Sequence, residues 1–246
     1  MRQNFISLVS HEMRTPLVAA MQYLELMGGN IVGALNTEQT RIVNRMKSRL
    51  SDLLALIDRW LELARIEDHQ VTDDFETFDF SPVVKEALEI IKPLADEKKI
   101  KIRDMSGDDV KLNGDRNMIK EIIVNLVSNG IKYNREGGEV TVQKKQESGF
   151  IVIDISDTGF GIPEEELGRI GKEFYRVKRE GLAVGFGLGL AIVKKILDIH
   201  NGRLEIKSAV DQGSTFRMYL PISTAVIGKT AAASCNCSRE SNKKGG

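Results

Sequence analysis

Residues 1–70 carry apolar side chains at helical spacing. Between residues 6 and 27 these side chains recur in steps of three and four, which places them on one face of a helix. Gly28, Gly29 and Asn30 then end this helix, and Thr37 is a candidate N-cap for a second one. The two stripes comprise Ile6, Val9, Met13, Leu17, Ala20, Leu24 and Met27, followed by Ile42, Met46, Leu50, Leu53, Ile57, Trp60 and Ala64. The pattern predicts an all-α helical hairpin.

A hairpin of two such helices cannot bury both apolar stripes fully within itself. A second copy would cover them, because two hairpins form a four-helix bundle in which all four stripes face inward. We therefore predict a homodimer through residues 1–67. The alternative is an antiparallel hairpin that packs against the rest of its own chain.

The segment that follows the hairpin is predicted to be a connector. Residues 71–80 are acidic, short and without helical period. Ser81 and Pro82 then give an N-cap and a first-turn proline for a helix through about Ala95. A connector at this place would allow one domain to move relative to the other.

Residues 81–222 alternate strand and helix patterns and predict an α/β domain with a mixed sheet. Alternating β-branched positions indicate strands at residues 99–103, 139–144, 150–156, 203–208 and 214–220. Helices are expected from Gly114-Asp115 onward and over residues 191–200. Asn201 and Gly202 are expected to end the last helix in a left-handed cap, with His200 in a structural role at the favourable C-terminal turn.

The composition limits the possible functions. The chain of 246 residues has room for one or two domains, and its 35 basic and 35 acidic residues do not favour nucleic acid as a partner. The sequence has no apolar run of about 18 residues and no signal-like pattern in its first residues, so neither a membrane span nor an export signal is expected in it. Cys235 and Cys237 are too closely spaced for a structural zinc site. Residues 223–246 are rich in Ala, Ser, Lys and Gly, so a disordered tail is expected.

The sequence Ser-His-Glu-Met-Arg-Thr-Pro at residues 10–16 sets a nucleophile beside an acid and a hydroxyl. His11 and Thr15 share a helix face because they are four residues apart, and Glu12 lies next to them. Pro16 leaves the carbonyl of Glu12 without its helical partner, so a bend near His11 is expected. A lone histidine on an amphipathic helix could instead be a packed or solvated residue.

Three further clusters occur in the α/β region. Asn125, Asn129 and Lys132 share one helix face, and carboxamide oxygens suit a hard cation such as Mg²⁺. Taken alone, the two asparagines could equally be capping or solvated residues on a surface helix.

Asp157 follows a strand and precedes Gly159 and Gly161, so its carboxylate could accept a hydrogen bond from an exocyclic amine such as that of adenine. A turn is the alternative for this Asp-x-Gly-x-Gly pattern. Residues 164–183 are polar and predict a mobile lid. Glycines then cluster at residues 185–189 before a helix, an arrangement typical of phosphate binding.

Together these clusters resemble, in order and spacing, the H, N, G1, F and G2 boxes of the sensor histidine kinases of two-component signalling. The resemblance covers nearly all of residues 5–222. It implies a dimerisation and phosphotransfer domain (1–70), a linker (71–80) and a catalytic domain of the GHKL or Bergerat fold (81–222), an α/β sandwich with helices on one face of the sheet.

The resemblance also implies a role for each site residue. On the first helix, His11 is the phosphoacceptor, Glu12 accepts a proton and Thr15 serves dephosphorylation. In the catalytic domain, Asn129 is the Mg²⁺ ligand, and Asp157, with Gly159 and Gly161, binds adenine. The remaining nucleotide contacts are Asn125, Lys132 and Tyr133, Arg176 for the γ-phosphate, and Gly185, Gly187, Leu188 and Gly189 around the phosphates.

Some residues depart from the family pattern. Gly171 stands where the F box often has an aromatic residue, and Phe186 replaces a small residue between the G2 glycines. Gly130 and Asn201 replace a common Ala and a common Gly. These departures put the anchoring of the lid in question and leave the polar site residues unchanged.

The resemblance implies ATP-dependent autophosphorylation on His11, phosphotransfer to an aspartate of a response-regulator receiver domain, and phosphatase activity toward that regulator. It also implies that the chain is the cytoplasmic part of a longer sensor that can be membrane-associated. The alternatives are a GHKL ATPase clamp, in which a glutamate base stands at the place of Asn125, and a catalytically inactive dimer scaffold. The sequence lacks the motifs of P-loop enzymes and of eukaryotic-type kinases.

Overall fold

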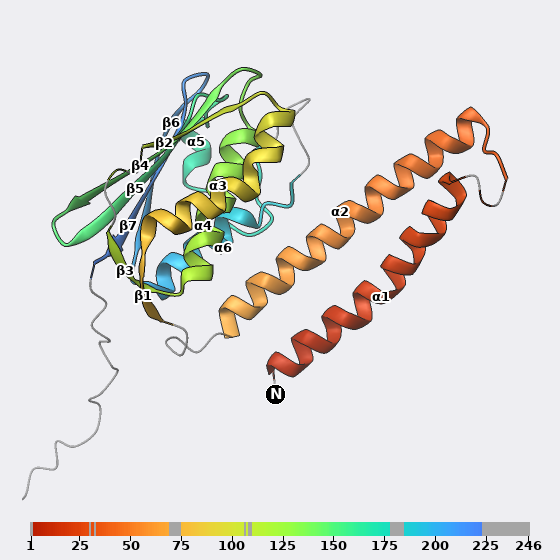
Figure 1. Cartoon of the computed structure of the whole chain (residues 1–246), viewed down its shortest axis with the longest axis horizontal. Helices are drawn as coiled ribbons and strands as arrows, with labels where there is room; N and C mark the ends of the chain where they lie inside the picture. Colours follow the sequence, from red (N-terminus) through yellow and green to blue (C-terminus); the bar gives the residue numbers. More distant parts are fainter. Residues whose placement is uncertain are drawn as a thin grey trace, which may run out of the picture.

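The computed structural model describes residues 2–29, 31, 33–68, 75–105, 107, 110–177 and 185–222 (Figure 1). Two long helices precede an α/β domain, as the sequence predicts. The helices are α1 (Arg2–Gly28), α2 (Thr37–Asp68), α3 (Phe80–Glu97), α4 (Arg116–Lys132), α5 (Glu164–Leu167) and α6 (Gly189–Ile199). The strands are β1 (Glu76–Asp79), β2 (Lys101–Met105), β3 (Lys111–Gly114), β4 (Glu139–Glu147), β5 (Phe150–Asp157), β6 (Arg203–Ala209) and β7 (Gly213–Pro221). The predicted tail, with both cysteines, lies outside the described residues.

The main sheet has five strands in the order β2-β4-β5-β7-β6. Strands β2 and β4 are parallel and the other neighbours are antiparallel, so the sheet is mixed. Helices α3, α4 and α6 cover one face of this sheet (Figure 1). The central strand β5 ends at Asp157, which is paired with Val140 on one side and Ser214 on the other. The fold thereby places Asp157 at the end of the central strand, on the face of the sheet that the helices cover.

The hydrophobic core lies between this sheet and its helices. Alternate positions of β5 point into it, and Ile151, Ile153 and Ile155 are almost completely buried. Helix α2 joins the same core through Leu63 and Ile66, which are 5% and 7% exposed. The end of the helical hairpin is therefore packed onto the α/β domain. No helix among the described residues combines the length and the apolar character needed to cross a bilayer.

Helix α2 is capped by Asn36, so the prediction that Thr37 is the N-cap is wrong. The Gln39 N–H donates to Asn36 Oδ1 at 2.8 Å, and the Asn36 N–H donates to Gln39 Oε1 at 2.9 Å. This reciprocal pair satisfies two backbone donors at the helix start. Thr37 is instead the first helical residue.

Two short strands went unpredicted. Strand β1 lies inside the predicted linker and pairs antiparallel with β3, because the Phe78 and Leu112 positions supply apolar contacts to the core. Helix α3 consequently begins at Phe80, whose N–H donates to the Val110 carbonyl at 3.0 Å, and Ser81 is not its N-cap. The helix also continues past Ala95 to Glu97.

The start of helix α4 and the end of helix α6 meet at His200. The Asp115 side chain caps α4 by accepting from the Asn117 and Met118 N–H groups, whereas Gly114 ends β3. His200 is buried, accepts the Asp115 N–H at Nε2 and donates from Nδ1 to the Ile196 carbonyl.

Burial lowers the pKa of His200, and the hydrogen bond that Nε2 accepts from the Asp115 N–H favours the neutral ring. Its expected structural role is confirmed by its two ring hydrogen bonds and by its stacking on Phe75. Asn201 has a φ of 51°, which confirms the left-handed cap.

Candidate nucleotide-binding site and phosphoacceptor helix

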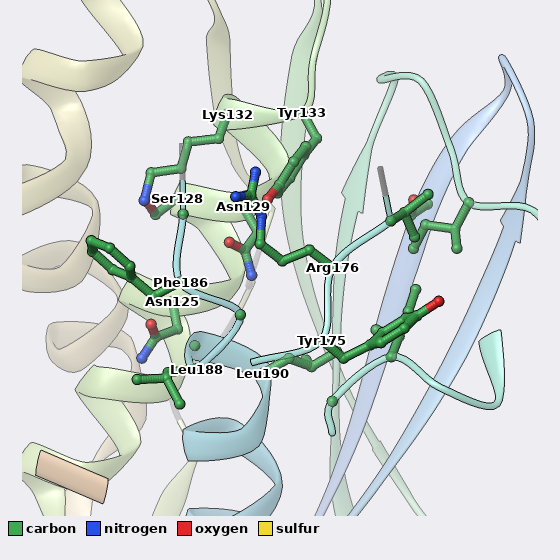
Figure 2. Close-up of a pocket in the computed structure, with 18 of the residues that line it drawn as sticks. Asn125, Ser128, Asn129, Lys132, Tyr133, Tyr175, Arg176, Phe186, Leu188 and Leu190 are labelled. Carbon is green, nitrogen blue, oxygen red and sulfur yellow. The ribbon is translucent and has the colours of Figure 1, made fainter. Parts of the chain in front are cut away.

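The candidate site residues of the α/β domain surround one pocket of about 430 Å³ (Figure 2). Its walls come from helix α4, the end of β5, the lid segment up to residue 177, the glycine loop 185–189 and helix α2. The pocket is lined by Asn125, Asn129, Lys132, Tyr133, Asp157, Gly161, Arg176, Gly185, Gly187, Leu188 and Gly189. Gly159 adjoins the pocket through its hydrogen bond to Asp157. Segments as far apart in the sequence as Asp52 and Phe216 are thus brought to one cavity.

Helix α4 presents Asn125, Asn129 and Lys132 to the pocket (Figure 2). Asn125 is only 5% exposed, and its Nδ2 donates to the Glu121 carbonyl at 3.0 Å and to Glu121 Oε1 at 2.7 Å. Its carboxamide oxygen is the atom that remains directed toward the Gly189 backbone. Burial, and to a lesser degree the charges of Arg59 and Lys98, lowers the pKa of Lys132. The helix therefore places two carboxamide groups beside a partly buried lysine.

Asp157 supplies a partly buried acid to the pocket. Burial raises the pKa of its carboxyl to about 6, although the Gly159 and Ser214 N–H groups donate to it and oppose the shift. The Gly159 N–H lies 2.8 Å from Oδ1. A desolvated carboxylate of this kind gains most from a ligand donor, which replaces the lost water.

The affinity of the site for an adenine nucleotide is therefore expected to depend on pH. We propose that the ionised carboxylate of Asp157 accepts the adenine amine, so protonation of this carboxyl near pH 6 would remove its negative charge and weaken the hydrogen bond. We expect the ADP affinity to be constant above about pH 7 and to fall about tenfold per pH unit well below pH 6. Calorimetric titrations at several pH values measure this dependence.

The Asp157→Asn variant is the control for that pH series, because it keeps the shape of the side chain and cannot titrate. Its weaker ADP binding should vary with pH only as the nucleotide phosphates do. Equal pH profiles for the variant and the unaltered chain would contradict the assignment of Asp157.

The glycine loop packs closely against the lid and α4. Gly187 has a φ of 73°, and a Cβ there would lie 2.7 Å from the Tyr175 carbonyl oxygen. A Cβ on Gly189 would lie 3.0 Å from Asn125 Oδ1. Helix α6 begins at Gly189 without a side-chain cap on its first turn. Leu188, Gly189 and Leu190 line the pocket, so the start of this helix lies at the cavity, as in helix N-termini that bind phosphate.

The lid has its own anchors despite the departure at Gly171. Gly171 has a φ of 85°, and a Cβ at this position would lie 2.5 Å from Lys194 Cε. Lys194 in turn donates to the Ile170 carbonyl at 2.8 Å. The Arg169 guanidinium lies 4.3 Å from the centre of the Tyr175 ring, whose hydroxyl donates to Glu166. The described part of the lid is therefore held by α6 and α5, and residues 178–184 lie outside the described residues.

The residues of the H box lie on helix α1, which continues past Pro16 to Gly28. The side chain of His11 lies outside the described residues. Glu12 and Thr15 are exposed, and Arg14 forms an ion pair of 2.5 Å with Asp58 on α2. Helix α2 lies between α1 and the α/β domain (Figure 1). The structure thus groups the nucleotide residues together and leaves the H box on a separate element.

Sequence reasoning missed the contribution of helix α2. Asp52, Ala55 and Arg59 line the pocket, and Arg59 pairs with Glu121 on α4. No local pattern marks these residues, because they become pocket residues only when the hairpin docks on the α/β domain. Other missed lining residues are Ser128, Phe160, Ile162, Ile170, Gly171, Tyr175, Val177, Phe186, Leu190, Ser214 and Phe216.

Comparison with known protein families divides the chain in the same way. Residues 1–69 match the His Kinase A (phospho-acceptor) domain. Residues 114–224 match the histidine kinase-, DNA gyrase B- and HSP90-like ATPases. Two different family matches, in this order, cover both the helical hairpin and most of the α/β domain.

Similar proteins carry the same combination. The chain is 31% identical to the histidine protein kinase DivJ of Caulobacter vibrioides, over 90% of this chain and 37% of that protein. It is also 31% identical to the sensor-like histidine kinase SenX3 of Mycolicibacterium smegmatis, over 89% of this chain and 57% of that protein. The chain thus spans about two fifths to three fifths of the length of these two relatives.

The structural likeness extends over both parts of the chain. Full-length ShkA in complex with AMPPNP aligns with a TM-score of 0.73 and 25% identity, over 90% of this chain and 46% of that one. The mycobacterial sensor histidine kinase MprB aligns with a TM-score of 0.53 and 28% identity, over 60% of this chain and 97% of that one. With a phospho-acceptor hairpin joined to an ATPase domain of this type, the chain belongs to the sensor histidine kinase family of two-component systems.

Proposed function

We propose that this chain binds ATP with Mg²⁺ in the pocket of the α/β domain and phosphorylates His11. The observation that carries the proposal is the convergence of the α4 carboxamides, Asp157 and the glycine loop on one cavity. Its volume of about 430 Å³ falls in the usual range for small-molecule sites. The family matches support the same reaction.

The residues present fit a magnesium nucleotide. Asp157 would accept the adenine amine, while the N–H groups at the start of α6 would bind phosphate oxygens. Lys132 and Arg176 would supply positive charge, and Asn129 would ligate the metal through its carboxamide oxygen. When bound, Mg²⁺ neutralises charge on the phosphate oxygens.

The reaction on His11 is a phosphoryl transfer in which positioning does most of the work. A ring nitrogen of the neutral imidazole forms a bond to the γ-phosphorus, and the bond from that phosphorus to the β–γ bridging oxygen breaks, releasing ADP. Glu12 accepts the proton from the other ring nitrogen.

The phosphoryl group would then pass from His11 to an aspartate carboxylate of a response-regulator receiver domain. Thr15 is exposed one helical turn after His11, where its hydroxyl could position water for dephosphorylation of that regulator. Incubation of the purified chain with magnesium and γ-labelled ATP tests the first step. Label that is stable in base and labile in acid identifies phosphohistidine, and its absence under all nucleotide conditions would contradict the proposal.

We further propose that the chain is a homodimer through residues 1–67. Four residues of the predicted α2 stripe, Ile42, Met46, Leu53 and Trp60, are 40–50% exposed in the single chain. A second hairpin would cover this apolar surface. Light scattering at micromolar concentration should give twice the chain mass of 27.4 kDa.

A charged substitution in the stripe should weaken that dimer. Met46→Asp places a carboxylate in the proposed interface and is expected to shift the mass toward the monomer, because burying an unpaired charge is costly. Ser48→Asp adds the same charge to another face of the same helix and should leave the mass unchanged. An unaltered chain that is monomeric under these conditions would overturn the dimer.

A further inference from the structure

Helix α2 forms ion pairs with two different helices from two neighbouring residues. Asp58 pairs with Arg14 of α1 at 2.5 Å, and Arg59 pairs with Glu121 of α4. Neighbouring residues on a helix point about 100° apart, so one stretch of α2 can contact both partners. The phosphoacceptor helix and the ATP-binding domain are therefore both tied to the same turn of α2.

The pair between Arg59 and Glu121 crosses the boundary between the hairpin and the ATP-binding domain. The Arg59 guanidinium also donates to Glu62 Oε2 at 2.9 Å. The side chains of Arg59 and Glu121 are 36% and 25% exposed. Solvent therefore screens the attraction between their charges less than it would at an open surface. Leu63 and Ile66 bury apolar surface on the same side of α2. Arg59 is thus the charged contact of a partly apolar docking surface.

This contact reaches the nucleotide pocket in two ways. The Glu121 oxygen that accepts from Arg59 also accepts from Asn125 Nδ2, at 2.7 Å. Arg59 itself lines the pocket with Asp52 and Ala55, and its charge contributes to the lowered pKa of Lys132. The docked helix α2 therefore forms a wall of the pocket and shares a hydrogen-bonded network with one of its carboxamides.

Helix α2 lies between helix α1 and the α/β domain (Figure 1), and its residues Asp52, Ala55 and Arg59 line the pocket of that domain. We propose that the Arg59–Glu121 ion pair is a latch that holds the ATP-binding domain docked on α2, and that it must open before the domain delivers a phosphoryl group to His11. The inference rests on the proposed kinase function. Arg59 and Glu121 are positioning residues in this scheme, since Arg59 acts on Asn125 only through Glu121.

Two substitutions remove the charge attraction while leaving Asn125 with a hydrogen-bond acceptor. Arg59→Ala retains Glu121, and Glu121→Gln retains a carboxamide oxygen at the same place. Each variant is expected to raise the initial autophosphorylation rate at saturating ATP about fivefold or more, a condition under which a change in nucleotide affinity does not alter the rate. The double variant should be no faster than either single variant, because both open the same contact.

Hydrogen–deuterium exchange measures the opening independently of the reaction. Amides of residues 55–66 and of the first turns of α4 should exchange faster in both single variants. Arg59→Lys keeps the charge and should restore most of the protection. Arg41→Ala is the matched control, because Arg41 pairs with Glu38 on the same helix and not with another domain.

Unchanged exchange in Arg59→Ala and Glu121→Gln, relative to Arg41→Ala, would overturn the latch. Faster exchange without faster autophosphorylation would overturn it as well, because the contact would then not limit transfer. A slower rate at saturating ATP would overturn it too, because the pair would then belong to the reactive arrangement. Failure of the proposed kinase function can be distinguished from failure of the latch. If the kinase proposal fails, the unaltered chain takes up no label, and hydrogen–deuterium exchange still reports whether α2 is docked.

Discussion

Replacing His11 with Gln is expected to abolish labelling by γ-labelled ATP, with a loss of at least about a thousandfold. Glutamine can donate and accept hydrogen bonds but has no nucleophilic ring nitrogen, so no phosphoramidate can form. His200 offers no substitute, because it is buried with both ring nitrogens hydrogen-bonded; His69 lies outside the described residues. Initial rates of incorporation at saturating ATP measure the effect.

The control for this substitution is nucleotide binding by the same variant. His11 lies on α1, separate from the pocket, so the ADP affinity of His11→Gln should remain within about twofold of that of the unaltered chain. Persistent acid-labile label in the variant would defeat the assignment of His11. A misfolded variant would lose both nucleotide binding and labelling. The melting temperature of His11→Gln is therefore compared with that of the unaltered chain, and we expect the two temperatures to be equal.

Replacing Asn129 with Ala is expected to lower autophosphorylation by a factor on the order of 10² to 10³. The residue lines the pocket one helical turn after Asn125, where its carboxamide oxygen would ligate Mg²⁺. Loss of a group that stabilises charge during phosphoryl transfer typically has an effect of this size. Calorimetry with and without Mg²⁺ separates metal ligation from a general loss of binding.

Asn129→Ala should abolish most of the difference in ADP affinity between magnesium and chelator. Ser128→Ala is the matched control, since it removes a polar group from the neighbouring position of the same helix and pocket. We expect this control to keep the magnesium dependence. A variant at Asn129 that still binds ADP more tightly with magnesium would show that another residue ligates the metal.

The helix faces and turns predicted for residues 81–222 are found in the structure, because they depend only on residues that are close together in the sequence. A carboxamide four residues from another lies on the same helix face whatever the surroundings, and glycines before a helix leave its N–H groups open. The strand and turn at residues 139–157 followed from alternation and from a Ser-Gly turn. Asn36, by contrast, was missed as a cap because two adjacent residues, Asn36 and Thr37, both suit that position.

The missed strands β1 and β3 show where such reasoning stops. Each has four residues, and neither has an alternating pattern long enough to separate it from a loop. They form because Phe78 and Leu112 pair across the strands and pack on the core of the domain. Long-range pairing of this kind has no local signal.

The sequence by itself determined that this chain combines a helical hairpin bearing His11 with an α/β domain suited to a nucleotide. Helical period, strand alternation and motif spacing are properties of neighbouring residues, so they can be recognised from the sequence alone. The docking of α2 on the α/β domain was decided only in the tertiary structure. Arg59 became a pocket residue and a partner of Glu121 because apolar burial at Leu63 and Ile66 brings together surfaces that lie 62 residues apart along the chain.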